Sequence, residues 1–425
     1  MKVLIITYYW PPSGGSGVQR WLKFVKYLRD FGIEPIVYTV ENPEYAIEDF
    51  SLENEIPEGV TVLRKPIFEP NTFFSFFSKK SKSQSSGFLN PNPGLAGKIL
   101  QYIRANYFIP DARKYWITPS VKYLEKYLKK HQIETIISTG PPHSMHLIAM
   151  KLKERLGVTW ISDFRDPWTE IDYFHQLPLT DKSKRKHYEL EKRVVSKSNA
   201  IIVVGNTMKK NFEKEASNIH VITNGFDSEN SQKIETLDTT FSLTHIGMMN
   251  ADRNPKKLWK VLRELCDEDI EFKNDLRIQL IGKIAPEVQE QITAFDANTI
   301  FTLDYISHDE AKLYQQKSQV LLLAINNVPS AKGIITGKIF EYLQANRPIL
   351  AIGPEDGDAA EIINDTKAGI MVGFEDKQKL KKTILDFYTK FKQHNLTTEK
   401  MNIQKYHRKK LTEELSLIIK STIVK

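Results

Sequence analysis

The feature that most constrains the fold is a repeated order of apolar runs, glycine or proline turns and helical stretches. In the first half, apolar runs lie at residues 3–9, 35–40, 60–65, 135–140, 158–164 and 200–205. The same order resumes in the second half at residues 241–247, 277–282, 299–306, 320–325 and 348–353. Continuous apolar runs joined by helices are typical of parallel strands covered on both faces. The sequence therefore predicts an α/β protein with two Rossmann-like, doubly wound parallel-sheet domains.

The polar stretch 227–240 divides the two halves. We expect an N-terminal domain over residues 1–230 and a C-terminal domain over residues 231–400. Residues 401–425 have the pattern of a basic amphipathic helix, which we expect to pack back on the N-terminal domain. No run approaches the ~20 apolar residues of a membrane span, and a single cysteine among 425 residues excludes a disulfide framework. These features predict a cytoplasmic protein.

A basic and aromatic stretch interrupts the strand pattern near residues 66–130. Residues 71–130 carry eleven basic and two acidic side chains, although the whole chain has a formal net charge of only +8. The same stretch holds twelve aromatic side chains. Basic groups mixed with aromatic rings suit a polyanion or the headgroup layer of an anionic membrane, and a solvated loop with its own small cluster is the alternative. We interpret the stretch as an insertion in the first domain.

A glycine-rich loop, Gly14-Gly15-Ser16-Gly17, follows the first apolar run. In open α/β sheets, ligands bind beyond the carboxyl ends of the strands. Glycines let the backbone approach a ligand closely, and the next helix offers unpaired N–H groups to an anion. The NAD fingerprint would need a third glycine at the position of Arg20. The loop therefore favours a ligand-approach role over a plain tight turn, but not NAD binding of that type.

The most informative segment of the second half covers residues 332–343, which follow an apolar run and begin a helix. Thr336 and Gly337 precede the helix, whose first N–H groups suit a diphosphate. Lys338 adds a positive charge for phosphate. Glu341, one turn further on, can accept two hydrogen bonds from vicinal ribose hydroxyls. The alternative is an acidic side chain that only stabilises the helix dipole.

Together these segments resemble retaining glycosyltransferases of family 4. The most specific are TGKIFEYLQANRPILAIG at 336–353, HIGMMNADRNP at 245–255, VITNGFD at 221–227 and the glycine loop. SDFRDPW at 162–168 is similar to an Arg-Asp-x-Trp element of many capsule and lipopolysaccharide sugar transferases. The resemblance covers nearly the full length and implies the GT-B architecture, in which two Rossmann-like domains face a cleft.

The resemblance also implies an activity. A hexosyl-type transferase of this family moves a sugar, with retention, from a nucleoside-diphosphate sugar to a saccharide or lipid-linked acceptor in cell-surface polysaccharide synthesis. The nucleotide sugar is then a co-substrate, and no other cofactor is expected. Because many acceptors of the family are lipid-linked diphosphates of the inner leaflet, the basic aromatic stretch is expected to rest on an anionic membrane surface. The enzyme would then be peripheral on the inner face of the cell membrane.

The resemblance implies a donor site in the C-terminal domain. Arg253 matches the family arginine that contacts the donor diphosphate, and Lys338 is expected to be the second cation. Glu341 matches the second glutamate of the family's E-x7-E motif, which binds the ribose. Gly333 stands where the first glutamate is expected, so a side-chain contact from that position to the donor sugar is missing.

Further donor contacts implied by the resemblance come from the backbone. Groups near Tyr305 and Ile306 are expected to face the base. Gly15 and Ser16 are expected to approach the donor phosphate and sugar from the other domain.

Arg253 and Lys338 are also the expected catalytic pair. Breaking the sugar–nucleotide bond leaves negative charge on the β-phosphate, and two fixed cations stabilise that charge without a metal ion. Asp-x-Asp sequences that hold a metal in other transferases occur at 267–269 and 356–358. Both lie in the second half, where this motif is not expected, and we interpret them as surface turns.

The acceptor site is expected at the end of the run 158–164. Asp163, Arg165, Asp166 and Trp168 follow or end that run. A carboxylate there can hydrogen-bond an acceptor hydroxyl, a role we assign to Asp166 as a catalytic residue, and Trp168 can stack on a sugar face. His143 is a weaker candidate for acceptor binding. The alternative is a buried Arg165–carboxylate pair that only supports the loop.

Three other functions remain as alternatives. Loss of the first motif glutamate at Gly333 is compatible with a non-catalytic sugar-nucleotide binding protein. An NAD-dependent oxidoreductase has a similar fold pattern but needs the missing glycine. Nucleic-acid binding lacks any accompanying motif, so we expect no nucleic-acid partner.

Overall fold

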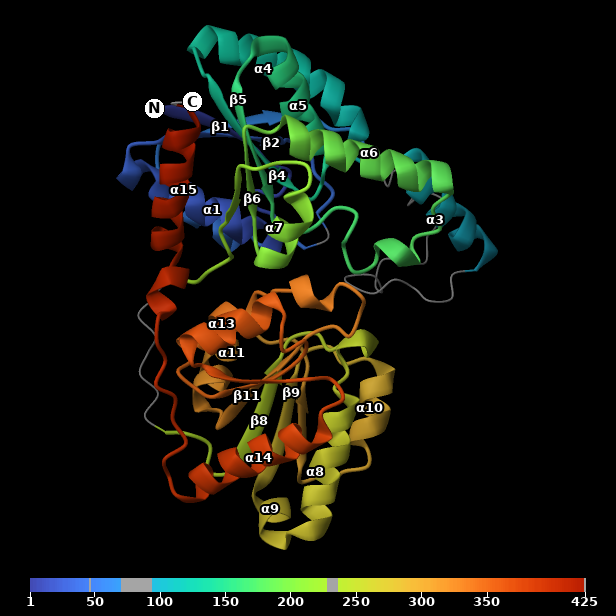
Figure 1. Ribbon diagram of the computed structural model, residues 1–425, viewed down its shortest axis with the longest axis vertical. Helices are drawn as coiled ribbons and strands as arrows, with labels where there is room; N and C mark the ends of the chain where they lie inside the picture. The colour runs from blue at the N-terminus through green and yellow to red at the C-terminus, as the bar shows by residue number, and fades with distance from the viewer. Residues whose placement is uncertain (46, 70–93, 228–235, 424–425) are drawn as a thin grey trace. The chain divides into compact units, whose positions relative to one another are not determined.

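The computed structural model describes residues 1–45, 47–69, 94–227 and 236–423, and divides the chain into two compact units (Figure 1). Unit 1 comprises Met1–Asn224 and Arg408–Lys425, and unit 2 comprises Gly225–His407. These boundaries differ slightly from those expected at residues 230 and 400. Within unit 2, the backbone N–H of Phe226 donates to the carbonyl oxygen of Tyr406 at 3.1 Å.

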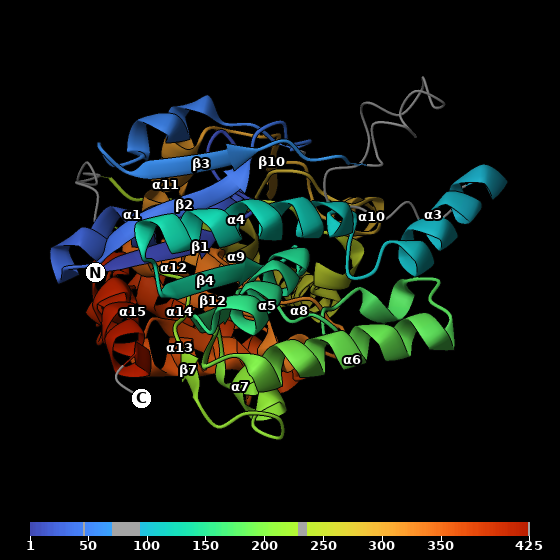
Figure 2. The same cartoon turned by 90° about the horizontal axis from the view of Figure 1, so that it is seen from above.

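Unit 1 contains a parallel sheet whose seven described strands have the order β3-β2-β1-β4-β5-β6-β7. Figure 2 shows β3, β2, β1 and β4 next to one another in that order. The strands are β1 (Lys2–Ile6), β2 (Glu34–Val40), β3 (Thr61–Lys65), β4 (Thr135–Gly140), β5 (Thr159–Phe164), β6 (Ala200–Val203) and β7 (Ile219–Val221). The strand order reverses between β1 and β4, and this switch point is where ligands bind in open α/β sheets.

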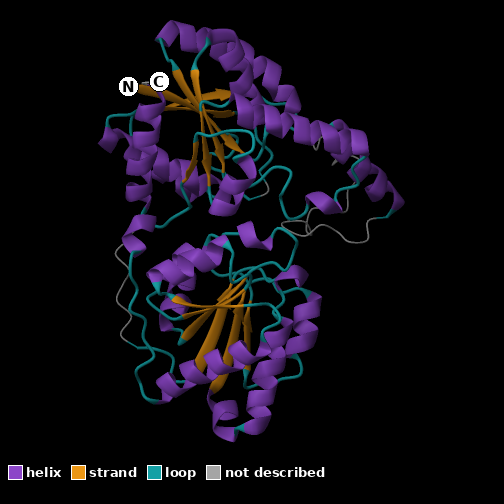
Figure 3. Ribbon diagram, in the orientation of Figure 1, coloured by secondary structure: helices purple, strands orange, loops and turns teal. Residues whose placement is uncertain are grey.

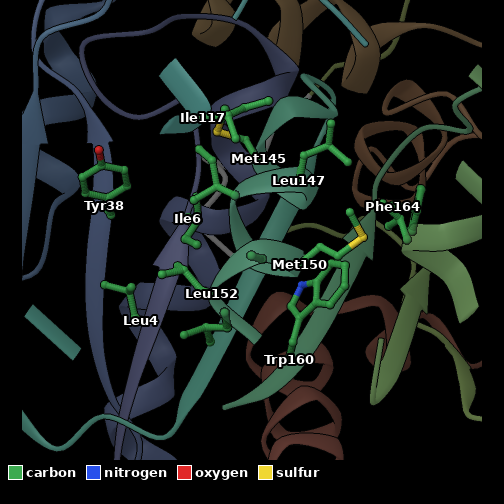
Figure 4. Packing of buried hydrophobic residues seen from close by; sticks show 14 of the residues in the cluster. Leu4, Ile6, Tyr38, Ile117, Met145, Leu147, Met150, Leu152, Trp160 and Phe164 are labelled. Carbon is green, nitrogen blue, oxygen red and sulfur yellow. The ribbon is translucent and has the colours of Figure 1, made fainter. Parts of the chain in front are cut away.

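Helices cover both faces of this sheet. The described helices of unit 1 are α1 (Ser16–Leu28), α3 (Leu95–Tyr107), α4 (Ile117–His131), α5 (Ser144–Leu156), α6 (Asp181–Lys197), α7 (Asn206–Phe212) and α15 (Arg408–Ile423), and of these α3 does not pack on the sheet. On one face, α1 and α15 pack with Val3 and Ile5 of β1. On the other face, α4 and α5 pack with Leu4 and Ile6, and Figure 4 shows these side chains among Met145, Met150 and Trp160.

Only part of the basic aromatic stretch lies within the described residues, because residues 70–93 fall outside them. In the described part, α3 is mostly exposed and makes hydrogen bonds through Asn106 near its C-terminal end, to the carbonyl of Pro178 and the N–H of Thr180, both at 2.8 Å. Helix α4, in contrast, is packed in the core through Val121, Leu124 and Leu128. The insertion in the strand–helix pattern therefore ends before α4.

Unit 2 repeats the architecture with a sheet of six described strands in the order β10-β9-β8-β11-β12-β13. The strands are β8 (Phe241–Ile246), β9 (Leu276–Ile281), β10 (Ile300–Leu303), β11 (Val320–Ala324), β12 (Ile349–Ile352) and β13 (Gly369–Val372). The helices are α8 (Lys256–Glu268), α9 (Ile270–Asp275), α10 (Pro286–Ile292), α11 (His308–Lys317), α12 (Lys338–Gln344), α13 (Asp358–Thr366) and α14 (Lys377–Lys392). Here the strand order reverses between β8 and β11.

The core of unit 2 also has two sides. Apolar side chains of α12 and α13 pack on β11 and β12. On the other side, Phe241 of β8 lies edge-on to Tyr388 of α14 at 5.4 Å between ring centroids, and Phe272 of α9 lies 4.9 Å from the same ring. Every pairing among the described strands is parallel. The predicted fold class, two doubly wound parallel-sheet domains, is confirmed (Figure 3).

Candidate functional site

The switch point of unit 2 brings together two segments that the sequence analysis singled out. Strands β8 and β11 are neighbours, with Val320 opposite Leu243 and Leu321 opposite Thr244. Beyond their carboxyl ends lie the segment from Gly247 to Arg253 and the segment that leads to Lys338, the first residue of α12. The topology therefore brings Arg253 and Lys338 to the edge of the sheet where a ligand binds.

Lys338 extends over Gly247, which has a φ of +114°. A Cβ at Gly247 would lie 2.7 Å from Nζ of Lys338 and 2.4 Å from its Cε, so a side chain there would displace the lysine from this position. No residue in the described part of the chain forms a hydrogen bond or ion pair with this amine. Burial, with a smaller contribution from the positive charge of Arg253, lowers the pKa of Lys338 to about 8. An unpartnered ammonium in a partly dry site favours binding of an anion.

Arg253 is fixed in position by the polar groups around it. It ends a short 3₁₀ helix, Ala251–Arg253, whose preceding residue Asn250 accepts a hydrogen bond from the Arg253 N–H at 2.9 Å. Its Nε donates to Oδ1 of Asn326 at 2.9 Å, and one terminal nitrogen donates to the carbonyl of Met248 at 3.0 Å. These bonds hold a positive charge near Lys338. Two fixed cations at one strand end suit a diphosphate.

His245 belongs to the same region, and the sequence analysis gave it no role. It is 1% exposed in β8, and its Nδ1 lies 3.1 Å from the carbonyl oxygen of Leu322 in β11. Burial, and to a lesser degree the charge of Lys338, lowers the pKa of His245 to about 3. The ring is therefore neutral at physiological pH and adds no third cation. A titratable residue near the carboxyl end of a strand was the signal that pointed to it.

The remaining predicted donor residues of unit 2 differ in burial and in hydrogen bonding. Oγ1 of Thr336 is buried and has no hydrogen-bond partner among the described residues, and Gly337 is exposed at the start of α12. Oε2 of Glu341 accepts a hydrogen bond from Gln315 at 3.3 Å. Tyr305, which is 93% exposed, and Ile306 lie in the loop after β10, two strands away from β8.

The glycine loop of unit 1 leads into α1. Gly15 has a φ of +82° and immediately precedes the helix, which begins at Ser16. Residues with a side chain rarely adopt this conformation, so the loop favours a glycine there. A Cβ at Gly15 would meet no atom within 4 Å, which leaves space beside the backbone.

Asp163, at the end of β5, is fully buried. Its two carboxylate oxygens accept hydrogen bonds from Arg20, from Nε1 of Trp21 at 2.7 Å and from Oγ1 of Thr139 at 2.8 Å. Because both oxygens are occupied and the side chain has no exposed surface, we no longer expect Asp163 to contact an acceptor.

Arg165 and Asp166 follow β5 and differ in exposure. Arg165 donates to the carbonyl oxygens of Gly17 and, at 2.7 Å, Pro141, and its guanidinium lies 4.8 Å above the ring of Tyr9. It therefore ties together the loops that follow β1, β4 and β5. The Asp166 side chain is 52% exposed, with its nearest cation, Nε of Arg165, 4.0 Å away. Of these two residues, Asp166 has the more accessible side chain.

Trp168 and His143 are both buried and face each other. Their rings are stacked with centroids 4.5 Å apart, and Nε1 of Trp168 donates to Nδ1 of His187 at 3.0 Å. Burial lowers the pKa of His143 well below its ordinary value. Since one face of Trp168 is covered by His143, the expected stacking on a sugar is replaced by packing within unit 1.

Two structural findings concern metals and membranes. Within the described residues, no group of three or more histidine, cysteine, aspartate or glutamate side chains is arranged to hold a metal ion. Asp356 of the sequence Asp-Gly-Asp instead accepts a hydrogen bond from Lys332 at 2.5 Å. None of the helices that the structure describes is both long and apolar enough to span a bilayer.

Comparison with known proteins gives one family match. Residues 83–230 match the family model of Glycosyltransferase Family 4. The chain resembles a family 4 glycosyltransferase. The matched segment contains the loops after β4 and β5, and therefore includes His143, Arg165 and Asp166. A search of the curated proteins gave no match.

Several solved structures with the same two-domain fold are glycosyltransferases, and another is a putative UDP-N-acetylglucosamine 2-epimerase from Listeria monocytogenes. Sucrose-phosphate synthase from Thermosynechococcus elongatus is 11% identical, with a TM-score of 0.65 over 100% of this chain and 99% of its own. HepE from Anabaena, solved with UDP and glucose, is 14% identical, with a TM-score of 0.60 over 99% and 100%. The lipopolysaccharide outer core galactosyltransferase WaaB is 11% identical, with a TM-score of 0.60 over 99% of both chains. At these identities the similarity concerns the GT-B fold. Together with the family match, it supports a glycosyltransferase.

Proposed function

We propose that the protein is a retaining, hexosyl-type glycosyltransferase that uses a nucleoside-diphosphate sugar as donor and needs no metal ion. Its acceptor is a saccharide or a lipid-linked saccharide in cell-surface polysaccharide synthesis. The observation that carries the proposal is the unpartnered amine of Lys338, which lies over Gly247 beside the fixed guanidinium of Arg253. This pair provides the positive charge that a departing diphosphate requires.

In the proposed reaction, the bond between the anomeric carbon and the β-phosphate oxygen breaks, and that oxygen takes the electron pair. Lys338 and Arg253 stabilise the resulting negative charge. The acceptor oxygen forms the new bond to the anomeric carbon, and its proton passes to the departing β-phosphate oxygen. We assign the hydrogen bond to this hydroxyl to Asp166, because its carboxylate is exposed, whereas Asp163 is enclosed.

The nucleoside part of the donor would be bound by the other predicted residues of unit 2. Glu341 is expected to accept hydrogen bonds from the ribose hydroxyls, in which case its bond from Gln315 orients the carboxylate. Thr336, whose buried hydroxyl lacks a partner among the residues described, can donate to a phosphate oxygen. The backbone near Tyr305 and Ile306 is expected to face the base. HepE was solved with UDP, so a uridine nucleotide is the first donor to test.

A thermal-shift screen with UDP-, GDP- and dTDP-sugars tests donor binding. A ligand at 100 times its Kd stabilises the folded protein by about 2.7 kcal/mol, which shifts the melting temperature by a few degrees. Transfer is then measured with the donor that binds, and the configuration of the product decides between retention and inversion. Binding of none of the donors, or binding without transfer to any saccharide or lipid-linked saccharide, would contradict the proposal.

We also propose that unit 1 rests on an anionic membrane surface, where a lipid-linked acceptor is found. Helix α3 exposes Leu95, Ile99 and Tyr107 to solvent, together with Lys98 and Arg104. In Figure 2 this helix projects from the rest of unit 1. An exposed helix that carries apolar and basic side chains and no acidic one is suited to the headgroup layer of anionic lipids.

Vesicle flotation tests this surface. We expect the protein to float with phosphatidylglycerol vesicles at low salt and much less with phosphatidylcholine vesicles. Lys98→Glu/Arg104→Glu should weaken flotation, whereas the matched change Lys382→Glu/Lys390→Glu on exposed positions of α14 should not. Absence of binding to anionic vesicles at low salt, or equal loss in both variants, would contradict the membrane role.

A further inference from the structure

A buried ion pair in unit 1 connects the acceptor-side loops to the end of that unit. Arg20 of α1 and Asp163 of β5 are both almost fully buried, and a terminal nitrogen of Arg20 lies 2.8 Å from Oδ1 of Asp163. Nε of Arg20 lies 3.1 Å from the same oxygen, so the guanidinium meets the carboxylate along one edge. Arg20 occupies the position at which the NAD fingerprint has a glycine. The reaction proposed above gives this pair no direct role.

The other contacts of Asp163 reach β4 and a second residue of α1. Oγ1 of Thr139, the second-last residue of β4, donates to Oδ2 at 2.8 Å. Nε1 of Trp21 in α1 donates to the same oxygen at 2.7 Å. Thr139 immediately precedes the loop that carries His143. Asp163 itself precedes Arg165 and Asp166 by two and three residues. One carboxylate thus joins α1 to the carboxyl ends of β4 and β5, which lead into the loops that carry His143 and Asp166.

The remaining donors of Arg20 hold the last residues of unit 1. One terminal nitrogen donates to the carbonyl of Thr223 at 2.9 Å and lies 3.3 Å from Oδ1 of Asn224. The other donates to the carbonyl of Ile222 at 2.9 Å. Asn224 is the last residue of this unit before the chain continues into unit 2. Arg20 therefore fixes the point at which the chain leaves unit 1.

We propose that Arg20 and Asp163 are positioning residues, which set the exposed Asp166 and the 222–224 segment relative to one another without touching a substrate. Both groups are buried, and the N–H donors of Arg20 and the carboxylate oxygens of Asp163 all take part in hydrogen bonds. Loss of one of these bonds leaves a buried charge with fewer partners. The segments that the bond connected are then held less firmly. Only the expected effect of these residues on catalysis rests on the proposed function. The physical coupling of the segments stands independently of it.

The test uses a mild variant, because removal of either charge risks unfolding. Thr139→Val removes one donor of Asp163 while keeping the shape of the side chain. Thr412→Val is the matched control, since Oγ1 of the equally buried Thr412 donates only to the carbonyl of Arg408 within α15, at 2.7 Å. Arg20→Lys is the second variant: it keeps the charge but cannot reach Asp163 and three backbone or amide oxygens at once.

Amide hydrogen exchange of the full chain provides a readout that does not depend on activity. In Thr139→Val and Arg20→Lys, we expect exchange to be at least tenfold faster in the loops at 140–143 and 165–168, and in Arg20→Lys also at 222–224. Thr412→Val should leave these segments unchanged. Faster exchange confined to the substituted residue's neighbours in sequence, or equal changes in the control, would overturn the inference.

Kinetics with the donor found above then test the consequence. We expect Thr139→Val to lower kcat fivefold or more and to leave the Kd of the donor within twofold, because the donor cations belong to unit 2. Unchanged kcat together with accelerated exchange would overturn the positioning role in catalysis. If the wild-type protein transfers no sugar, the proposed function fails, but the exchange experiment still decides whether the residues act as a unit.

Discussion

Replacing Lys338 by methionine should raise the free energy of unfolding of the protein without nucleotide. The same replacement should lower its affinity for nucleotide. The amine has no partner in the described part of the chain, and its pKa is lowered from 10.5 to about 8, chiefly by burial. Since each pKa unit corresponds to about 1.4 kcal/mol, the charged form costs the folded protein about 3 kcal/mol at neutral pH. Methionine has a similar length and no charge, so Lys338→Met should raise the free energy of unfolding by about 1–3 kcal/mol.

The sign of the pH dependence follows from the same values. Below about pH 8 the lysine is protonated in both the folded and the unfolded chain, and the wild-type protein bears the full cost. Between about pH 8 and 10.5 the unfolded chain binds more protons than the folded one, so the stability of the wild-type protein rises with pH. The advantage of Lys338→Met should therefore be constant at acidic and neutral pH and disappear as the pH approaches 10.5.

Binding of UDP should show the opposite effect. A hydrogen bond from a charged donor to phosphate contributes about 1.5–3 kcal/mol, so Lys338→Met should raise the Kd for UDP by about 10- to 100-fold. Urea unfolding with and without UDP measures both effects in one assay. Lys332→Met is the control, because Lys332 is exposed and paired with Asp356, and it should change neither quantity appreciably. A less stable Lys338→Met protein that binds UDP as tightly as the wild type would refute the role of Lys338.

Three further predictions concern the acceptor group, the metal and the packing of unit 1. Asp166→Asn should lower turnover more than tenfold, or by more than about 1.4 kcal/mol, while donor binding persists; unchanged turnover would remove Asp166 from the site. Activity should survive EDTA, because Arg253 and Lys338 supply the charge, whereas its loss and rescue by manganese would show metal dependence. Leu415→Ala, at a fully buried position where α15 packs on α1, should cost about 2–5 kcal/mol of unfolding free energy. The exposed Leu417→Ala on the same helix should cost little, and similar urea midpoints for both would contradict this packing.

The fold could be predicted from the sequence because parallel strands buried on both faces appear in it as continuous apolar runs. All eleven apolar runs contain a strand of the structure, from β1 at Lys2–Ile6 to β12 at Ile349–Ile352. The two strands that were not predicted are β7, Ile219–Val221, and β13, Gly369–Val372, which end the two sheets. Strand β7 has only three residues, with His220 at its centre, whereas β13 is a short apolar run that the sequence analysis did not assign.

The segments that meet at the switch points were also predictable, but the surroundings of each side chain were not. The topology of a doubly wound sheet fixes which loops meet at the switch point, so the segments containing Gly15 and Lys338 could be chosen from the sequence. Whether a polar side chain in such a loop is enclosed depends on partners that are distant in the chain. Asp163 is enclosed by Arg20, 143 residues earlier, and one ring face of Trp168 is covered by His143. No local pattern records such contacts.

Asp163 and Lys338 show how the structure separates two roles that look alike in the sequence. Asp163 lies near the carboxyl end of β5 and Lys338 begins the helix that follows β11, and each was assigned to a substrate. Asp163 receives hydrogen bonds from three side chains and has no exposed surface, so the protein itself satisfies its charge. Lys338 keeps a charge that nothing in the described part of the chain pairs with, although burial opposes that charge. A protein retains such an unfavourable group where a ligand supplies the missing partner, and for this reason the search for the donor begins at Lys338.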